Sequence, residues 1–376
     1  MDSKKYNNTK LAIGISKSIV VFVLIFLFVF LDYSLKLDNY LFQTFENPYL
    51  RFIIFILIIG FAGSILFSPL SYYSGFYLEH KYNLSNQNIW KWILENLKGL
   101  VVSLAVGIPV LLIFYYSLEK FNTDWWLPFS IAMFFISVVL ARIAPIVILP
   151  LFYKIIPIEN DELKFRISEL SKDAGLKIDN VYKFDMSKNT RKANAAFTGI
   201  GKSKRIILGD TLLEKYSNDE IETVLAHEMG HYKKKHIVKG IFFNTALSFI
   251  TFFVIAKLYE HSIALFGFNS LTQIGALPLL TLWAMVVGLF LTPLGNILSR
   301  KYEYEADEYA VTATSKADDF ISTLNKLSEQ NLGDKQPHPF VEWFFYSHPS
   351  IEKRIKAIKE FAGTNNYRNT ELAGKS

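Results

Sequence analysis

Residues 227–231 read His227-Glu228-Met229-Gly230-His231, and this stretch constrains the 376-residue chain more than any other. On an α-helix, residues four apart lie on one face, so the imidazoles of His227 and His231 can bind one metal ion. Glu228 lies beside that ion, where its carboxylate can deprotonate a bound water. This H-E-x-x-H pattern is typical of zinc metalloproteases. We therefore expect one Zn²⁺ per chain and an endopeptidase with Glu228 as a catalytic residue.

A strong helix start precedes the motif. Ser217-Asn218-Asp219-Glu220 has the spacing of a capping box and leads into an apolar run. The motif therefore belongs to a helix with a polar, capped beginning. The alternative interpretation is a pair of surface histidines on an amphipathic helix.

A catalytic zinc needs a third protein ligand and one open position. The best candidate lies in the acidic stretch Glu303-Tyr304-Glu305-Ala306-Asp307. Glu303 and Asp307 are four residues apart, so they share a helix face. With Glu303 as ligand, Asp307 can accept the second N–H of a ligating histidine. On spacing alone, a solvated acidic face explains the stretch equally well.

Composition restricts the choice of sites and partners. The chain has no cysteine, which excludes disulfides, iron–sulfur clusters and cysteine-based zinc sites. Hydrophobic residues make up 51% of the sequence and the mean hydropathy is +0.23. The net charge of +6 reflects lysines and arginines on loops, and no motif indicates a nucleic-acid partner.

Six apolar segments are long enough to cross a bilayer as helices, which takes about 20 residues. They comprise residues 11–31, 52–72, 97–118, 125–149, 237–258 and 276–298. Lys4, Lys5 and Lys10 precede the first segment and Lys17 lies near its start, but no small-residue cleavage site follows, so we interpret it as a retained span. The distribution of lysine and arginine between the loops favours both termini and both polar segments on the cytoplasmic side.

The chain divides accordingly into five parts. We expect four spans in 1–152, an α/β zinc protease domain in 153–236, two spans in 237–298, a helical completion of the protease domain in 299–362 and a disordered tail in 363–376. Within the polar segment, helical periodicity predicts a helix over 159–174. Short β-prone runs predict strands at 181–184, 193–199 and 205–208.

These stretches together resemble the Ste24-type CAAX prenyl proteases of the M48 metallopeptidase group. Beyond the zinc helix through His236, the resemblance rests on Asn194-Ala195-Ala196-Phe197, on residues 204–213 and 299–307, and on Ser347-His348-Pro349 with Arg354. The Glu303-x-x-x-Asp307 element is specific to this group, and it favours Glu303 as the third zinc ligand. His236 appears in the family too, but we place it at the end of the motif helix, facing away from the zinc.

The resemblance implies a mostly α-helical, polytopic membrane protein. Its helices form a barrel around a water-filled chamber, which a small α/β gluzincin-like zinc domain caps. Substrates of the family carry a prenylated C-terminal cysteine followed by three residues, which are removed. The resemblance also implies that Asn194, Ala195, Ala196 and Phe197 line the substrate as a strand, that His348 acts near the scissile bond and that Arg354 faces the active site. Eukaryotic members have seven spans, whereas this chain shows six.

We expect the lipid bilayer and a peptide with a hydrophobic or prenylated C-terminus as partners. The membrane is the plasma (inner) membrane in a bacterium and the endoplasmic reticulum in a eukaryote. Three alternatives stay open: a quality-control protease of the HtpX type, a non-catalytic transporter or scaffold, and a site-2-like intramembrane protease. The long N-terminal helical part argues against the first, the complete set of motif residues against the second, and the capped polar helix against the third.

Overall fold

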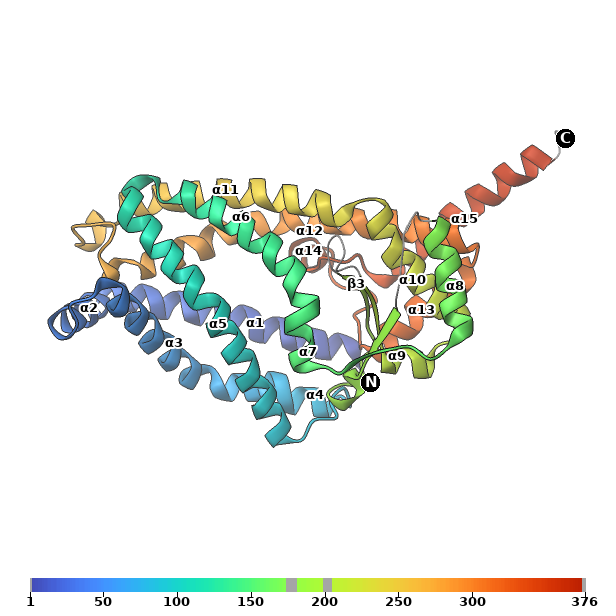
Figure 1. Cartoon of the computed structure of the whole chain (residues 1–376), viewed down its shortest axis with the longest axis horizontal. Helices are drawn as coiled ribbons and strands as arrows, with labels where there is room; N and C mark the ends of the chain where they lie inside the picture. The colour runs from blue at the N-terminus through green and yellow to red at the C-terminus, as the bar shows by residue number, and fades with distance from the viewer. Residues whose placement is uncertain (1, 174–180, 199–204, 374–376) are drawn as a thin grey trace.

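The structure, a computed structural model, describes residues 2–173, 181–198 and 205–373, which form a long helical body with a small sheet (Figure 1). In this part of the chain, six helices are long and apolar enough to cross a membrane, and each overlaps one of the six predicted spans. They are α1 Ser3–Phe30, α3 Pro48–Tyr72, α5 Ile89–Phe121, α6 Trp126–Ile143, α11 His236–Ser262 and α12 Pro278–Thr314.

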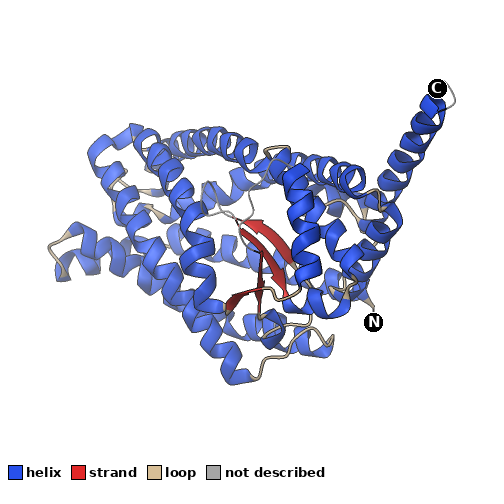
Figure 2. Ribbon diagram, turned by 45° about the vertical axis from the view of Figure 1, so that its right-hand side comes forward, coloured by secondary structure: helices blue, strands red, loops and turns tan. Residues whose placement is uncertain are grey.

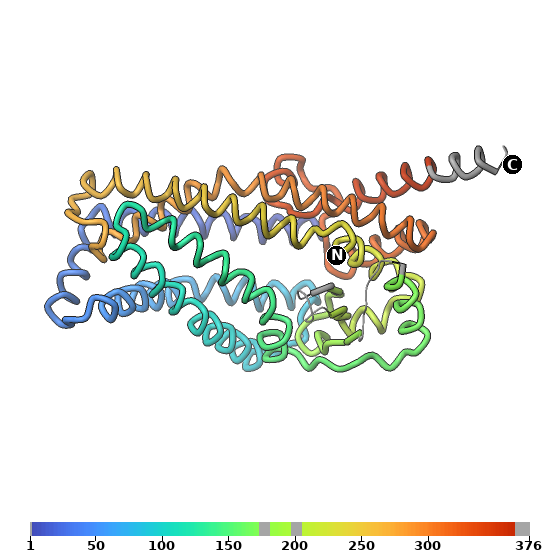
Figure 3. Tube along the Cα trace, turned by 45° about the horizontal axis from the view of Figure 1, so that its top comes forward, coloured from blue at the N-terminus to red at the C-terminus, as the bar shows by residue number. Residues whose placement is uncertain are grey.

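The six long helices form a ring. Their contacts give the order α1, α12, α11, α6, α5 and α3. The rings of Phe28 on α1 and Phe55 on α3, with centroids 6.3 Å apart, close the circle. Few residues of the apolar windows are buried in five of these helices, unlike in a close-packed bundle. Figure 3 shows the helices running along the length of the molecule, with the sheet region at one end. This arrangement is the helical barrel that the resemblance implies.

Two π-helices follow or interrupt the long helices, and a proline lies near or within each. Pro69 lies near the end of α3, and the π-helix Tyr73–Tyr77 follows directly. Pro145 lies within the second π-helix, Ala144–Ile148, between α6 and α7 Leu149–Phe152. Proline lacks the N–H that an α-helix requires and is common at such interruptions.

A four-stranded sheet lies among the helices at one end of the barrel (Figure 2). Its strands are β1 Ile155–Pro157, β2 Val181–Phe184, β3 Ala195–Thr198 and β4 Arg205–Gly209, in the order β1-β2-β4-β3. Strands β2 and β4 are parallel, and the other two pairs are antiparallel. The prediction placed β2 correctly and the other two strands within about two residues at either end. It missed β1, whose three residues are too few to show an alternating pattern.

Helices cover the sheet and build the core of the polar domain. The helix predicted over 159–174 is α8 Asp161–Asp173, and the motif helix is α10 Asn218–Lys233. The predicted capping box is present: the Ser217 hydroxyl accepts from the Glu220 N–H at 3.2 Å, and the Glu220 carboxylate accepts from the Ser217 N–H at 3.0 Å. The core contains Leu163, Ile167, Ile206, Leu208, Leu225, Met229 and Phe320.

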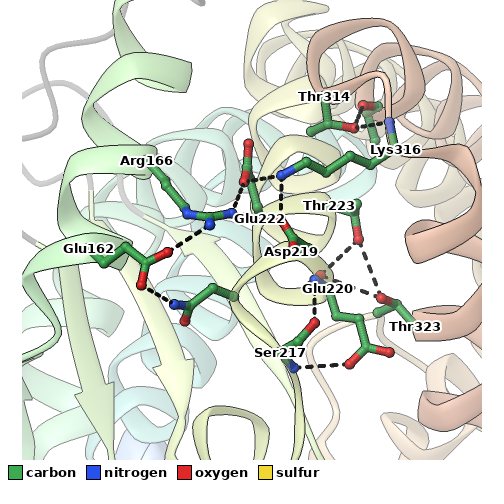
Figure 4. Close-up of polar contacts among 12 residues, drawn as sticks. Glu162, Arg166, Ser217, Asp219, Glu220, Glu222, Thr223, Thr314, Lys316 and Thr323 are labelled. Atoms are coloured by element: carbon green, nitrogen blue, oxygen red, sulfur yellow. Dashed lines mark hydrogen bonds and ion pairs between the residues drawn. The ribbon is translucent and has the colours of Figure 1, made fainter.

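An ion-pair cluster joins α8, α10 and the start of α13 Ala317–Gln330 (Figure 4). Arg166 contacts Asp219 at 2.6 Å and Glu222 at 3.0 Å. Lys316 contacts the same two carboxylates at 2.5 and 2.7 Å. Two cations and two anions thereby fix the first turn of the motif helix between its neighbours.

The C-terminal helix departs from the expectation of a disordered tail over 363–376. Helix α15 runs from Ile351 to Ala373 (Figure 1), and residues 374–376 lie outside the described part. Phe361 and Ala362 pack against the core of the polar domain, so the helix is anchored just before the point where the tail was expected to begin. The polar composition after 362 therefore does not end the helix.

Candidate active site

The motif helix α10 and the long helix α12 come into close contact at Gly230. A Cβ atom placed on Gly230 would lie 3.0 Å from the Cα of Ala306 and 3.1 Å from its carbonyl oxygen. Such distances are shorter than ordinary van der Waals contact, so the glycine allows this approach. Ala306 lies between Glu303 and Asp307, and the contact therefore brings the acidic stretch against the histidine motif.

Three side-chain atoms from these helices converge. His227 Nε2 and His231 Nε2 are 3.2 Å apart. Glu303 Oε2 lies 3.6 Å from the first, and Glu303 Oε1 lies 3.4 Å from the second. Among the described residues, these three form the group whose ligand atoms all lie within 4.8 Å of one another. Two imidazole nitrogens and one carboxylate oxygen are the donor set of many catalytic zinc sites, so the residues fit that metal.

Each of the two histidines is held through its other ring nitrogen. His227 Nδ1 lies 2.9 Å from Asp307 Oδ1, and His231 Nδ1 lies 3.0 Å from His236 Nδ1. The Nε2 of His236 contacts Glu305 Oε2 at 3.0 Å. If His236 donates its Nε2–H to Glu305, its Nδ1 accepts the Nδ1–H of His231, which leaves His231 Nε2 free to bind a metal.

His236 is the residue whose position the sequence interpretation had wrong. It does not end the motif helix: α10 ends at Lys233, Lys235 has a φ of 59°, and His236 begins α11. The turn brings the imidazole back towards His231, and it stacks on Tyr302 with centroids 4.1 Å apart. His236 stays outside the group of three converging ligand atoms, but it contacts the other ring nitrogen of His231.

Arg354 of α15 lies beneath the site and is buried. Its Nε and Nη2 donate to the two oxygens of Asp307 at 2.8 and 2.6 Å, and its Nη1 lies 3.4 Å from Glu303 Oε2. Burial lowers the pKa of Arg354, but Asp307 and Glu303 outweigh that effect and raise it above its ordinary value. The guanidinium group of Arg354 thus contacts Asp307 and Glu303. That Arg354 contacts the substrate stays a prediction.

His348 approaches Glu303 from the loop between α14 Pro339–Phe345 and α15. Its Nδ1 lies 3.0 Å from Glu303 Oε2, and this contact raises the pKa of His348. The imidazole is largely exposed, so it can reach a bound molecule. Glu228 is half-buried and close enough to act on the pKa of both His348 and Arg354. The structure therefore gathers the proposed catalytic residues around one point.

The predicted substrate strand lies beside the motif helix. Ala195, Ala196 and Phe197 pair through their backbones with residues 206–208 of β4, and the Asn194 carbonyl accepts from the Gly209 N–H at 2.9 Å. Strand β3 contacts α10 and is at the edge of the sheet, with β4 as its partner strand in the described part of the chain.

Two contributors were not identified from the sequence: Gly230 as the point of helix contact and His236 as the partner of His231. The only available signals were the small residue within H-E-x-G-H and a histidine shortly after it. Neither indicates a role until the helices are packed.

Comparison with known proteins identifies the family. The model of peptidase family M48 matches residues 157–362, and the model described as "CAAX prenyl protease N-terminal, five membrane helices" matches residues 1–154. The chain belongs to peptidase family M48. This M48 protein is 33% identical over 322 residues to CAAX prenyl protease 1 of Saccharomyces cerevisiae, a match that covers 81% of this chain and 71% of the yeast protein.

Other relatives extend the comparison. Identity to a metalloprotease of Bacillus subtilis, YhfN, is 31% over 365 residues, covering 94% of this chain and 84% of that protein. The crystal structure of S. mikatae Ste24p superposes with a TM-score of 0.83 at 29% identity, covering 95% of this chain and 88% of that one. The M48 protein described here is thus an integral, multi-pass membrane metalloprotease of the Ste24 type. The expectation of an enzyme is confirmed.

Proposed function

We propose that this protease uses one zinc ion, held by His227, His231 and Glu303, to remove the last three residues from peptides with a prenylated or otherwise hydrophobic C-terminus. The observation that carries the proposal is the convergence of three ligand atoms from α10 and α12. The yeast relative is named CAAX prenyl protease 1 and the human relative CAAX prenyl protease 1 homolog, and these names support the substrate class.

A zinc ion at this place would lower the pKa of a bound water and polarise the scissile carbonyl. The chain's own residues do the rest. The Glu228 carboxylate accepts the proton of the attacking water and passes it to the leaving amine. Asp307 and His236 hold the two imidazoles with their Nε2 atoms free. Arg354 fixes Asp307 with two charge-assisted hydrogen bonds.

Two further elements serve the substrate in this proposal. Strand β3 is an edge strand in the described part of the chain, and Asn194 with Ala195, Ala196 and Phe197 would offer backbone groups to which an extended peptide can add as a strand. The exposed ring of His348, next to Glu303, lies within reach of a scissile carbonyl. The sheet edge would orient the peptide, and His348 would stabilise charge that develops during cleavage.

We also propose that the zinc domain faces the cytoplasm, because lysines concentrate in the polar segments that flank the spans. The membrane is the plasma (inner) membrane in a bacterium and the endoplasmic reticulum in a eukaryote. In a bacterium, an unprenylated hydrophobic peptide would replace the prenylated one.

The test is cleavage of one peptide sequence with and without a farnesyl group on its cysteine, analysed by mass spectrometry. We expect release of the C-terminal tripeptide, faster from the farnesylated form. Equal rates would retain the protease but remove prenylation from its specificity. Cleavage at internal sites of unprenylated membrane peptides, with the farnesylated peptide left intact, would favour the quality-control alternative.

A further inference from the structure

Helix α14 turns aromatic side chains away from the protein. Phe340, Trp343 and Phe345 are 56%, 45% and 37% exposed. With Phe344 they form one patch: the Phe340 ring centroid lies 5.9 Å from that of Trp343 and 5.8 Å from that of Phe344. On a water-facing surface, a short helix would normally turn such rings inward, because removing aromatic area from water is strongly favourable.

The polar side chain of the same helix points inward. Glu342 is 4% exposed. Its carboxylate accepts from the Ser350 N–H at 3.1 Å and pairs with Lys353 at 2.8 Å. The helix therefore has its polar contacts towards the protein and its aromatic rings outward, the reverse of a helix that packs on a soluble domain. A non-aqueous surrounding for the outer face explains this inversion.

Contacts with α12 fix the position of α14 along the membrane normal. Asn296 donates to the Phe344 carbonyl at 2.6 Å. One turn further on, Arg300 donates to the carbonyls of Glu342, Trp343 and Tyr346. Asn296 lies inside the predicted last span, which ends at 298, and Arg300 lies just beyond it. The aromatic patch is thus held at the level where that span leaves the hydrocarbon, the level that Trp and Tyr prefer in membrane proteins.

Exposed apolar side chains of α12 lie close in sequence to its contact with α14. On α12, Phe290, Leu294 and Ile297 are exposed and precede or flank Asn296. Such side chains on a membrane-spanning helix face lipid at no cost. An aromatic face held at Asn296 and Arg300, where this span ends, would meet the boundary between acyl chains and headgroups.

We propose that the aromatic face of α14 lies in the interfacial layer of the lipid bilayer, as a membrane contact additional to the six spans. The Ser347-His348 loop follows the helix directly, so this contact would also fix the height of His348 above the membrane. The inference concerns lipid contact and does not depend on which peptide is cleaved.

The chain has no cysteine, so single labelling sites can be introduced cleanly. We would prepare the Trp343→Cys variant and attach an environment-sensitive fluorophore to the introduced thiol. The full chain is then reconstituted in phosphatidylcholine–phosphatidylglycerol nanodiscs. The quenching of its fluorescence is then measured with lipids that carry a spin label near the headgroup and, separately, with aqueous iodide. Lys356→Cys, on the exposed surface of α15, is the matched control. Phe340→Cys repeats the measurement should Trp343→Cys not fold.

We expect the label on α14 to be quenched severalfold more by the spin-labelled lipid than the label at position 356, and to be less accessible to iodide. A label on α14 that iodide quenches as strongly as the label at 356, without lipid quenching, would overturn the proposal. Shielding from both quenchers would overturn it as well, because protein or a bound peptide would then cover the face.

Discussion

Arg354 on α15 and Asp307 on α12 form a two-point pair, with Nε–Oδ2 and Nη2–Oδ1 distances of 2.8 and 2.6 Å. The same Oδ1 lies 2.9 Å from Nδ1 of His227 on α10. The C-terminal helix therefore orients a predicted metal ligand through one shared carboxylate. Three helices that are distant in sequence must dock before that histidine is fixed.

Replacing Arg354→Lys keeps the charge but loses the planar, two-point contact with Asp307. We expect the affinity for zinc to fall by about 10- to 100-fold, the usual effect of removing such support from a ligating histidine. Competition with a chelator measures this loss. Lys356→Arg, on the exposed side of the same helix, serves as control. Unchanged affinity in Arg354→Lys would show that His227 does not depend on this pair.

His236→Phe retains the stacking on Tyr302 but removes the hydrogen bond to His231. We expect weaker zinc binding and lower activity with little change in thermal stability, because the ring still fills its place. Tyr302→Phe keeps the stack and should leave zinc binding unchanged. Equal zinc affinity in His236→Phe and the unaltered protein would rule out a role for His236 in orienting His231.

Gly230→Ala adds a methyl group where α10 meets Ala306 of α12. The two helices must separate by a few tenths of an ångström, which moves His227 and His231 away from Glu303. We expect lower zinc affinity and lower activity. Gly240→Ala is the control, because a Cβ there meets no atom within 4 Å. If both variants behave alike, close packing at Gly230 is not what assembles the site.

Glu220, in the first turn of the motif helix, should make the stability of the protein depend on pH. Burial raises the pKa of Glu220, but Lys326 and the Ser217 N–H outweigh it and hold the pKa below its ordinary value of 4.5. The charged form thus stabilises the fold above about pH 4.5, and this contribution is lost as the pH falls through the lower, folded-state pKa. Glu220→Gln keeps the capping geometry and removes only the charge.

We expect Glu220→Gln to melt at a lower temperature than the unaltered protein near neutral pH, with the gap closing as the pH is lowered. Glu329→Gln, at an exposed ion pair with Lys335, should change the melting temperature little at any pH. A gap for Glu220→Gln that stays constant with pH would mean that its effect does not come from the charge.

The elements with strong local signals could be predicted from the sequence. Long apolar runs marked the six spans, and the capping box at Ser217 and Glu220 marked the start of α10. These features depend on neighbouring residues only. Strand β1 has no such signal, and the composition after residue 362 did not indicate that α15 continues to Ala373.

The site was predictable only in part for the same reason. His227, Glu228 and His231 are adjacent on one helix, so their spacing alone predicts a metal site. Glu303 was equally well explained as a surface acid until the family resemblance favoured it, because its approach depends on the contact at Gly230. The turn at Lys235 that returns His236 to the site is a backbone feature with no counterpart in helical spacing.

In the proposed mechanism, His227, His231 and Glu303 hold the metal and Glu228 moves the proton. The most direct measurement is zinc content per chain together with peptide cleavage, for purified Glu228→Gln and Glu303→Gln. We expect one zinc per chain and no cleavage for Glu228→Gln, and loss of both zinc and cleavage for Glu303→Gln. Full zinc occupancy and cleavage in Glu303→Gln, or normal cleavage in Glu228→Gln, would contradict it.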